Sequence, residues 1–145
     1  MTLVNIISEA WGWTGIRPRR IVDRNAFGNL LIEDHEEKYW RICPEELSCS
    51  VVAGGTVEFQ QLIEDAEFRR DWQMAALVAE AEAELGEPEE GRCFCLKIPA
   101  VVGGAYTMAN IGQICLEELI GFSGDFAEQI KDLPDGARIR LKVVE

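Results

Sequence analysis

Short runs of apolar, aromatic and β-branched residues are separated by polar turns in the first third of the chain, which is the pattern of consecutive β-strands. Residues 29–33 and 38–43 are two such runs around a polar tetrapeptide, and they predict a hairpin. An arginine-rich run at residues 17–24 precedes the hairpin, and a third run at residues 47–53 follows it and stops at two glycines. Strands that follow one another with short turns indicate an antiparallel meander.

Other segments repeat their apolar residues with the period of a helix. Residues 3–11 and 56–63 predict two short helices, and Thr56 is in position to cap the second. Residues 67–85 predict one longer helix. Its apolar stripe consists of Met74, Leu77, Val78, Ala81 and Leu85.

The second half of the chain adds helical and extended patterns in turn. Residues 116–131 have the helical period, but two internal glycines leave open whether they form one helix or two, with Ser123 capping the second. Residues 92–99, 111–116 and 137–144 have the pattern of strands. The last of these follows a Pro-Asp-Gly turn and exposes three basic residues on one face.

These elements predict an α+β fold, with an antiparallel sheet of five or six strands and helices packed on one side. A chain of 145 residues with 48% hydrophobic content can close one core, so a single domain over residues 1–145 is expected. The glutamate-rich stretch 80–90 is where this domain would divide into subregions 1–86 and 87–145.

The chain is strongly acidic, with 26 Asp and Glu against 14 Lys and Arg and a net charge of -12. Nucleic acid binds to basic surfaces, so it is a poor direct partner for this chain. A cationic protein is a better partner, because opposite charge speeds encounter and disfavours wrong partners. The alternative, that the acidity serves solubility alone, stays open at this point.

Several features predict a cytoplasmic protein. No run approaches the ~20 apolar residues of a membrane helix, and residues 1–7 lack the basic region and cleavage site of a signal peptide. The five cysteines are odd in number and lie in predicted strands, which fits buried, reduced thiols.

No group of residues has the pattern of a catalytic or metal site. The only histidine, His35, lies among acidic residues in the predicted turn, and adjacent pairs such as Glu45-Glu46 point in different directions. Gly103-Gly104 lacks the Lys-Ser/Thr of a phosphate loop and predicts a tight turn, and Cys93-x-Cys95 lacks a second ligand pair. We therefore predict free thiols, no metal, no cofactor and no catalytic residue.

Five segments of the second half occur in a distinctive order: a strand at 92–99, the turn Gly103-Gly104-Ala105-Tyr106, the pair Asn110-Ile111, the helix start at 116–120, and residues 129–136 with their closing strand. From about Arg92 onward, this order resembles the C-terminal domain of bacterial type VI secretion immunity proteins, whose founding members neutralise DNase effectors. In the first half, residues 27–31 and 39–46 resemble stand-alone members and, more faintly, the hairpin of the SUKH superfamily of immunity proteins.

The resemblance implies inhibition by occlusion, in which a folded acidic protein docks on a cognate effector toxin and blocks its active site or substrate groove. A nuclease-type toxin fits the composition, because nucleases need basic grooves. Two-domain members carry an additional N-terminal GAD-like domain, which this chain is too short to hold.

A function from another class stays open, namely a small cytosolic ligand-binding domain or enzyme that uses the Gly103-Gly104 turn and Tyr106. A deep pocket with converging polar groups would favour it.

Partner-binding residues are expected in exposed turns and on acidic faces. The hairpin turn ranks first, the loop around Tyr106 and the start of helix 116–131 follow closely, and the glutamate run 80–90 is third because ordering it would cost entropy. The candidates are Glu33, Asp34, Glu36, Glu37, Tyr106, Glu117 and Glu118.

Overall fold

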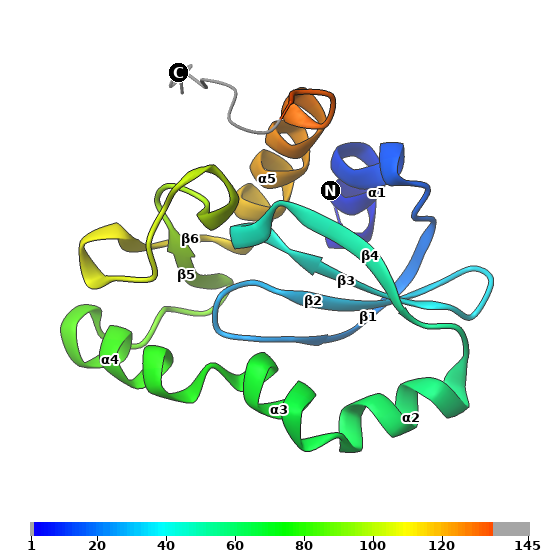
Figure 1. The fold of residues 1–145 in the computed structure, drawn as a ribbon, viewed down its shortest axis with the longest axis horizontal. Helices are drawn as coiled ribbons and strands as arrows, with labels where there is room; N and C mark the ends of the chain where they lie inside the picture. The colour runs from blue at the N-terminus through cyan, green and yellow to red at the C-terminus, as the bar shows by residue number, and fades with distance from the viewer. Residues whose placement is uncertain (1, 135–145) are drawn as a thin grey trace.

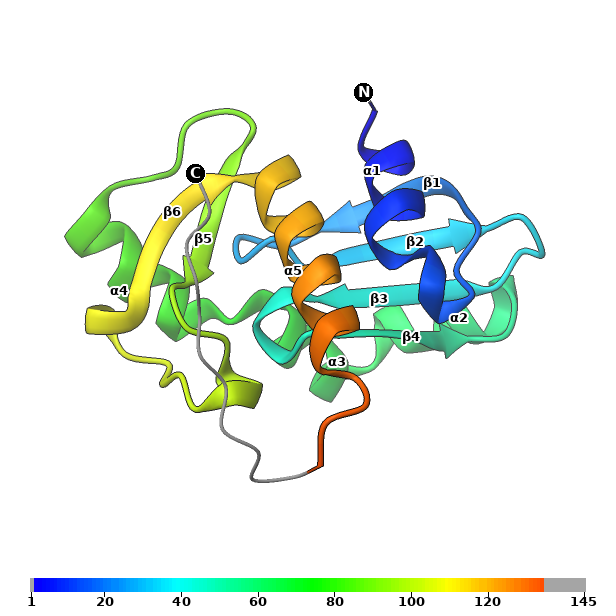
Figure 2. The ribbon, with the colours of Figure 1, turned by 90° about the horizontal axis from the view of Figure 1, so that it is seen from above.

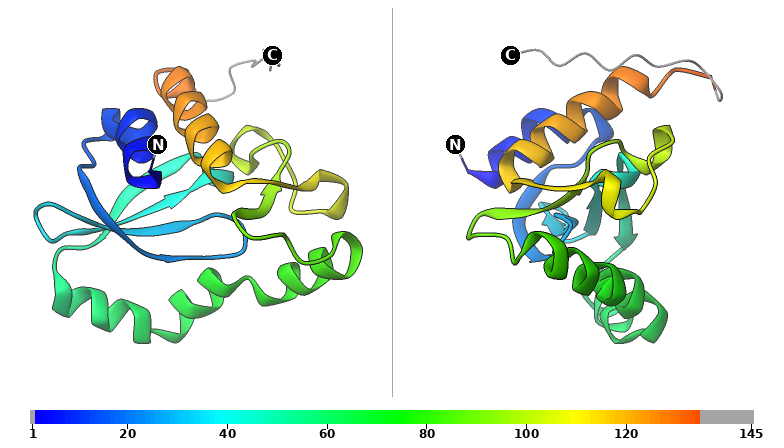
Figure 3. Two further views of the ribbon diagram at one scale, coloured as in Figure 1. Left: turned by 180° about the vertical axis from the view of Figure 1, so that it is seen from behind. Right: turned by 90° about the vertical axis from the view of Figure 1, so that its left-hand side faces the viewer.

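The computed structural model describes residues 2–134, whose helices and strands form three layers (Figures 1 and 3). The α-helices are α1 (Leu3–Trp11), α2 (Thr56–Glu64), α3 (Ala66–Gln73), α4 (Ala75–Leu85) and α5 (Leu116–Ile130). The strands are β1 (Pro18–Arg24), β2 (Leu30–Asp34), β3 (Tyr39–Cys43), β4 (Ser48–Ala53), β5 (Arg92–Leu96) and β6 (Ile111–Cys115). Short 3₁₀ helices are η1 (Gly12–Thr14), η2 (Pro44–Glu46), η3 (Ala100–Val102) and η4 (Met108–Asn110).

The first four strands form the predicted antiparallel meander, in the order β1-β2-β3-β4. All five residues of β2 are buried, because this strand lies inside the sheet and both of its faces are covered. Helices α1 and α5 lie on one face, and α2, α3 and α4 form an arc along the other (Figures 1 and 3). The predicted α+β class is confirmed, but helices cover both faces of the sheet.

The remaining two strands form a separate antiparallel sheet of β5 and β6, so the six strands do not make one sheet. The helical arc α2–α4 carries the chain beyond the end of the larger sheet before β5 begins (Figure 1). The start of α5 lies between the two sheets (Figure 2). One backbone hydrogen bond links the smaller sheet to the turn before β2, from the Phe94 amide to the Ala26 carbonyl at 2.9 Å.

The predicted helix 67–85 is divided into α3 and α4 at Met74, which has the left-handed backbone angles φ 47° and ψ 40°. The break lets two buried residues serve different parts of the core. Trp72 packs in a cluster with Tyr39 and Phe59, whereas Ala81 packs beside the β5–β6 sheet. The prediction of one continuous helix is therefore wrong. Of its predicted stripe, Met74, Leu77, Val78 and Ala81 do pack in one cluster, but the last member, Leu85, is 43% exposed.

Two predicted caps also differ from the structure. Gly55 is the residue that caps α2, and Thr56 is the first helical residue. Ser123 lies inside α5, where its hydroxyl donates to the Leu119 carbonyl at 2.6 Å, and α5 is one continuous helix. The predicted strand 137–144 and most of the turn before it lie outside the described residues.

Helices α1 and α5 approach each other closely. The indole of Trp11 donates to the Ile120 carbonyl at 3.0 Å. A Cβ placed on Gly124 would lie 2.5 Å from the Ala10 carbonyl oxygen, whereas one on Gly121 would meet only Ile6, at 3.8 Å. Packing thus requires glycine at position 124, whereas position 121 has room for a side chain.

We predict opposite effects for the same substitution at these two glycines. Gly124→Ala should lower the free energy of unfolding by roughly 1–3 kcal/mol, because backbone atoms of α1 cannot move aside cheaply. Gly121→Ala should raise it by up to ~1 kcal/mol, because alanine is the better helix former. Urea denaturation checks both, and equal effects would contradict the close helix contact.

Candidate functional site

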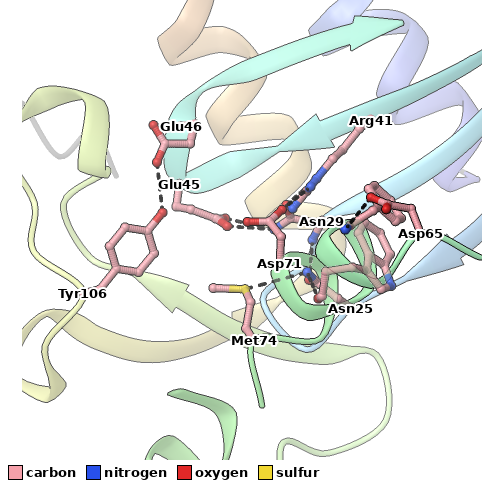
Figure 4. Close-up of polar contacts among 11 residues, drawn as sticks. Asn25, Asn29, Arg41, Glu45, Glu46, Asp65, Asp71, Met74 and Tyr106 are labelled. Atoms are coloured by element: carbon pink, nitrogen blue, oxygen red, sulfur yellow. Dashed lines mark hydrogen bonds and ion pairs between the residues drawn. The ribbon is translucent and has the colours of Figure 1, made fainter. Parts of the chain in front are cut away.

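A cleft of about 480 Å³ opens where the end of β3, the junction of α3 and α4, and the loop before η4 meet. Figure 4 shows its polar groups converging from these three directions. Three carboxylates and one guanidinium lie in its wall, so the lining is net negative. The residues are Arg41, Cys43, Glu45, Glu46, Ser48, Asp71, Met74 and Tyr106.

Helix η2 forms one wall and directs its two glutamates differently. Pro44 starts this turn, as its fixed φ favours at a helix start. Glu45 is 5% exposed and points inward, whereas Glu46 is exposed at the mouth. Leu47 then takes the left-handed conformation, φ 48°, and leads the chain into β4.

The inner wall is a chain of hydrogen bonds with Asn29 at its centre. The Asn29 amide nitrogen donates to both carboxylate oxygens of Glu45, at 2.9 and 3.0 Å. Its oxygen accepts from Nε and one terminal nitrogen of Arg41, at 3.1 and 2.8 Å. The other terminal nitrogen of Arg41 donates to Asp71 at 2.7 Å. The neutral side-chain amide of Asn29 thus binds both the Glu45 carboxylate and the Arg41 guanidinium.

Aromatic rings and a second asparagine fix this chain to α3. The Arg41 guanidinium lies over the rings of Trp72 and Phe68, 5.2 and 5.9 Å from their centroids. The Asn25 side chain donates to the Trp72 carbonyl at 3.0 Å, and its oxygen accepts from the backbone N–H of Asn29 at 2.9 Å. Arg41 is therefore held in place and already paired.

Tyr106 forms the opposite wall, and its hydroxyl donates to Glu46 at 3.0 Å. Asn110 holds the loop by donating to the carbonyls of Ile98 and Ala105, at 2.9 and 3.0 Å. A side chain on Gly104 would collide with the Ile98 carbonyl, so this turn needs glycine for close backbone approach. The tight turn predicted at Gly103-Gly104 is confirmed.

The titratable groups in the cleft favour hydrogen bonding over nucleophilic chemistry. Burial raises the pKa of Cys43, and the neighbouring Glu45 carboxylate raises it further. Burial of the hydroxyl, together with Glu45 and Glu46, raises the pKa of Tyr106. Both groups therefore stay protonated at neutral pH, and a protonated thiol is a poor nucleophile.

Burial affects cysteines outside the cleft as well. All five are free thiols, and burial raises the pKa of Cys49 to about 11 and that of Cys93 to about 12. Residues 2–134 contain no cluster of three or more metal-ligating side chains. No helix in that range is long and apolar enough to cross a membrane.

Two of the predicted partner-binding residues are buried supports of the hairpin. Glu33 is 5% exposed and accepts from Arg20 at 2.6 Å, Arg19 at 3.2 Å and Tyr39 at 3.3 Å. Asp34 is also 5% exposed and closes the turn. It accepts from the amides of residues 36 and 38 and from the Trp40 indole, all within 2.9 Å. The expectation that both lie exposed in the turn is wrong.

The other candidates are exposed but do not form one surface. Glu36 and Glu37 lie in the hairpin turn, where Glu36 pairs with Lys38 at 3.3 Å. This turn is at one end of β3, and the cleft with Tyr106 is at the other. Glu117 and Glu118 are exposed in the first turn of α5.

Sequence reasoning missed most of the cleft. Its members come from segments that are far apart in the chain, and each has an ordinary local role as a strand, turn or helix residue. The Pro-Glu-Glu sequence directly after a strand is the available local signal for the cleft. The missed residues are Asn25, Asn29, Arg41, Glu45, Glu46 and Asp71.

Residues 54–127 match a family model described as "T6SS immunity protein Tdi1, C-terminal". The chain belongs to this family of type VI secretion immunity proteins. The family inferred from the sequence is confirmed. The match begins earlier than residue 92, directly after β4, and ends at residue 127, so it does not cover the segments 27–31, 39–46 and 129–136. No curated protein matches the chain.

The residues matched by the family model supply only part of the lining of this immunity protein's cleft. Asp71, Met74 and Tyr106 lie within the matched residues, whereas Arg41 and the η2 glutamates lie in the meander that precedes them. The site therefore exists only where the family domain packs against the N-terminal hairpin.

The buried hairpin acids predict a specific loss of stability in acid. The Arg20 hydrogen bond lowers the pKa of Glu33 despite some desolvation. Burial alone would raise the pKa of Asp34, but hydrogen bonds from Trp40 and from the amides of residues 38 and 36 outweigh it and lower the pKa. With folded-state pKa values below the unfolded values near ~4, both carboxylates stabilise the fold at neutral pH. That stabilisation is lost as the pH falls through the folded-state values.

Asp34→Asn should therefore lower the free energy of unfolding by roughly 1–3 kcal/mol at pH 7 and by much less at pH 3. Urea denaturation at both pH values measures this. Glu37→Gln is the matched control, because the Glu37 side chain is exposed and accepts no hydrogen bond within residues 2–134. An equal loss at both pH values in Asp34→Asn would contradict the assignment.

Proposed function

We propose that this immunity protein binds and neutralises a cognate nuclease-type effector in the cytoplasm by covering the effector's active site or substrate groove. The family supports the binding of an effector, and the charge of -12 supports a cationic target. A nuclease presents basic side chains to the phosphate backbone, and an anionic protein can occupy the same groove.

The observation that carries this proposal is the negative cleft with Tyr106 and Glu46 at its mouth. Arg41 is neutralised by Asp71 and held by Asn29, so the charge left in the cleft is that of the two glutamates, with Glu45 inside and Glu46 at the mouth. Tyr106 is 41% exposed and presents an aromatic ring beside that charge. Tyrosine is a frequent anchor of protein interfaces, and a carboxylate beside it favours an arginine or lysine of the partner.

The volume of the cleft also favours a second candidate, a small-molecule-binding domain, because ligand pockets commonly measure about 300–1,000 Å³. Such pockets are mostly apolar with few polar groups, whereas this lining carries four charged side chains. We therefore place the effector first. The discriminating measurement is whether the purified protein binds the toxin encoded beside its gene.

Charge reversal at the cleft should slow association with that toxin. Glu46→Lys is expected to lower the association rate about tenfold at low salt and to flatten its salt dependence, because it removes attraction at the contact surface. Tyr106→Ala should instead raise the dissociation rate about tenfold, as expected for an aromatic anchor. Surface plasmon resonance at several salt concentrations separates the two effects.

Glu36→Lys is the matched control. Glu36 is also an exposed glutamate with one partner, Lys38, but it lies at the end of β3 that is away from the cleft. It should bind nearly as the wild type does. If Glu36→Lys weakens binding and Glu46→Lys does not, the hairpin turn is the contact surface. If the wild type neither binds the toxin nor protects cells from it, the proposed function is wrong.

A further inference from the structure

Strand β4 forms one edge of the larger sheet, and within residues 2–134 its only strand neighbour is β3. Helix α2 contacts β4 from the sheet face that α3 also covers, and no strand in the described part of the chain lies beyond β4 (Figure 2). An edge strand presents a row of backbone N–H and C=O groups that can pair with another extended chain. Proteins usually protect such edges with charges, proline or bulges.

The two edges of this sheet differ sharply in such protection. Strand β1, with the sequence PRRIVDR, carries a proline and four charged residues, and its pairing with β2 has two register shifts. Strand β4, with the sequence SCSVVA, has no charge and no proline. Its pairing is regular from Ser48 to Val51, and the single shift lies beyond that point. Among residues 2–134, the β4 edge is therefore open to pairing, and the β1 edge is protected.

The open edge runs into the cleft. Cys49 packs against the core cluster that contains the buried residues of α1, and the hydroxyl of Thr14 in η1 contacts its sulfur at 3.5 Å. Because side chains alternate along a strand, Ser48 and Ser50 lie on the other face, and both are exposed. Ser48 lines the cleft, and Ser50 is paired with Arg41, which also lines it. An added strand would therefore direct alternate side chains toward the carboxylates of the cleft.

We propose that an extended segment of the effector, bearing lysine or arginine, adds to β4 as a fifth strand and places a cationic side chain in the cleft. Backbone pairing would supply affinity, and the negative lining would select the basic residue. The small, uncharged side chains of Ser48 and Ser50 leave room for the incoming chain. This inference rests on the proposed function and adds the mode of binding to it.

The test uses the full chain and the toxin encoded beside its gene. Val51→Lys places a charge on the open edge at a residue that is already 46% exposed, and it should lower the affinity at least tenfold. Val57→Lys, at a valine of α2 that is 72% exposed, is the matched control and should change the affinity less than about twofold. Hydrogen exchange should show new protection of the β4 amides in the complex.

The outcomes separate this inference from the proposed function. Tight binding of the wild type without β4 protection, and with Val51→Lys unaffected, overturns the inference and leaves the function standing. Protection in the free protein of the β4 amides that point away from β3 also overturns it: in a dimer seen by light scattering the occupant is a second copy, and in a monomer it is the chain itself. A wild type that fails to bind the toxin overturns the proposed function and this inference with it.

Discussion

The amide of Asn29 holds the two opposite charges of the inner cleft, and the shape of the site depends on it. Glu45 is almost fully buried, and a buried carboxylate is costly unless hydrogen bonds compensate it. Asn29 donates to that carboxylate and accepts from Arg41 with its other atom, so neither charge faces the core unpaired. Arg41 is then free to reach Asp71 on α3, which joins the sheet to the helical arc.

The same contacts explain why the cleft lies between two parts of the chain. The meander supplies Asn29, Arg41 and the η2 glutamates, and the family-matched residues supply Asp71 and Tyr106. The break at Met74 permits this arrangement, because it lets α3 turn toward Arg41 while α4 covers the smaller sheet. A single straight helix could not serve both places.

The protonation states in the cleft suit recognition. The raised pKa of the Tyr106 hydroxyl keeps it a hydrogen-bond donor, and the raised pKa of Cys43 keeps the thiol unreactive. Glu46 remains at the mouth as an exposed acceptor. A site of this kind offers an aromatic ring, a carboxylate and a strand edge to a partner, which are common elements of protein interfaces.

The sequence by itself determined the class of elements and their order. Short runs between polar turns indicated strands β1 to β4 nearly within their observed bounds, and helical periods indicated α1, α2 and α5, because these patterns lie in the residues of each element itself. The order of motifs after residue 92 also indicated the family. The tertiary structure alone decided that Glu33 and Asp34 are buried, that the strands form two sheets, and that the helix breaks at Met74. It also brought Tyr106 to Glu46 across 60 positions of the chain. Local patterns mark a residue as polar or apolar, but the partner that satisfies a polar group comes from a distant segment, and its position depends on how the whole chain packs.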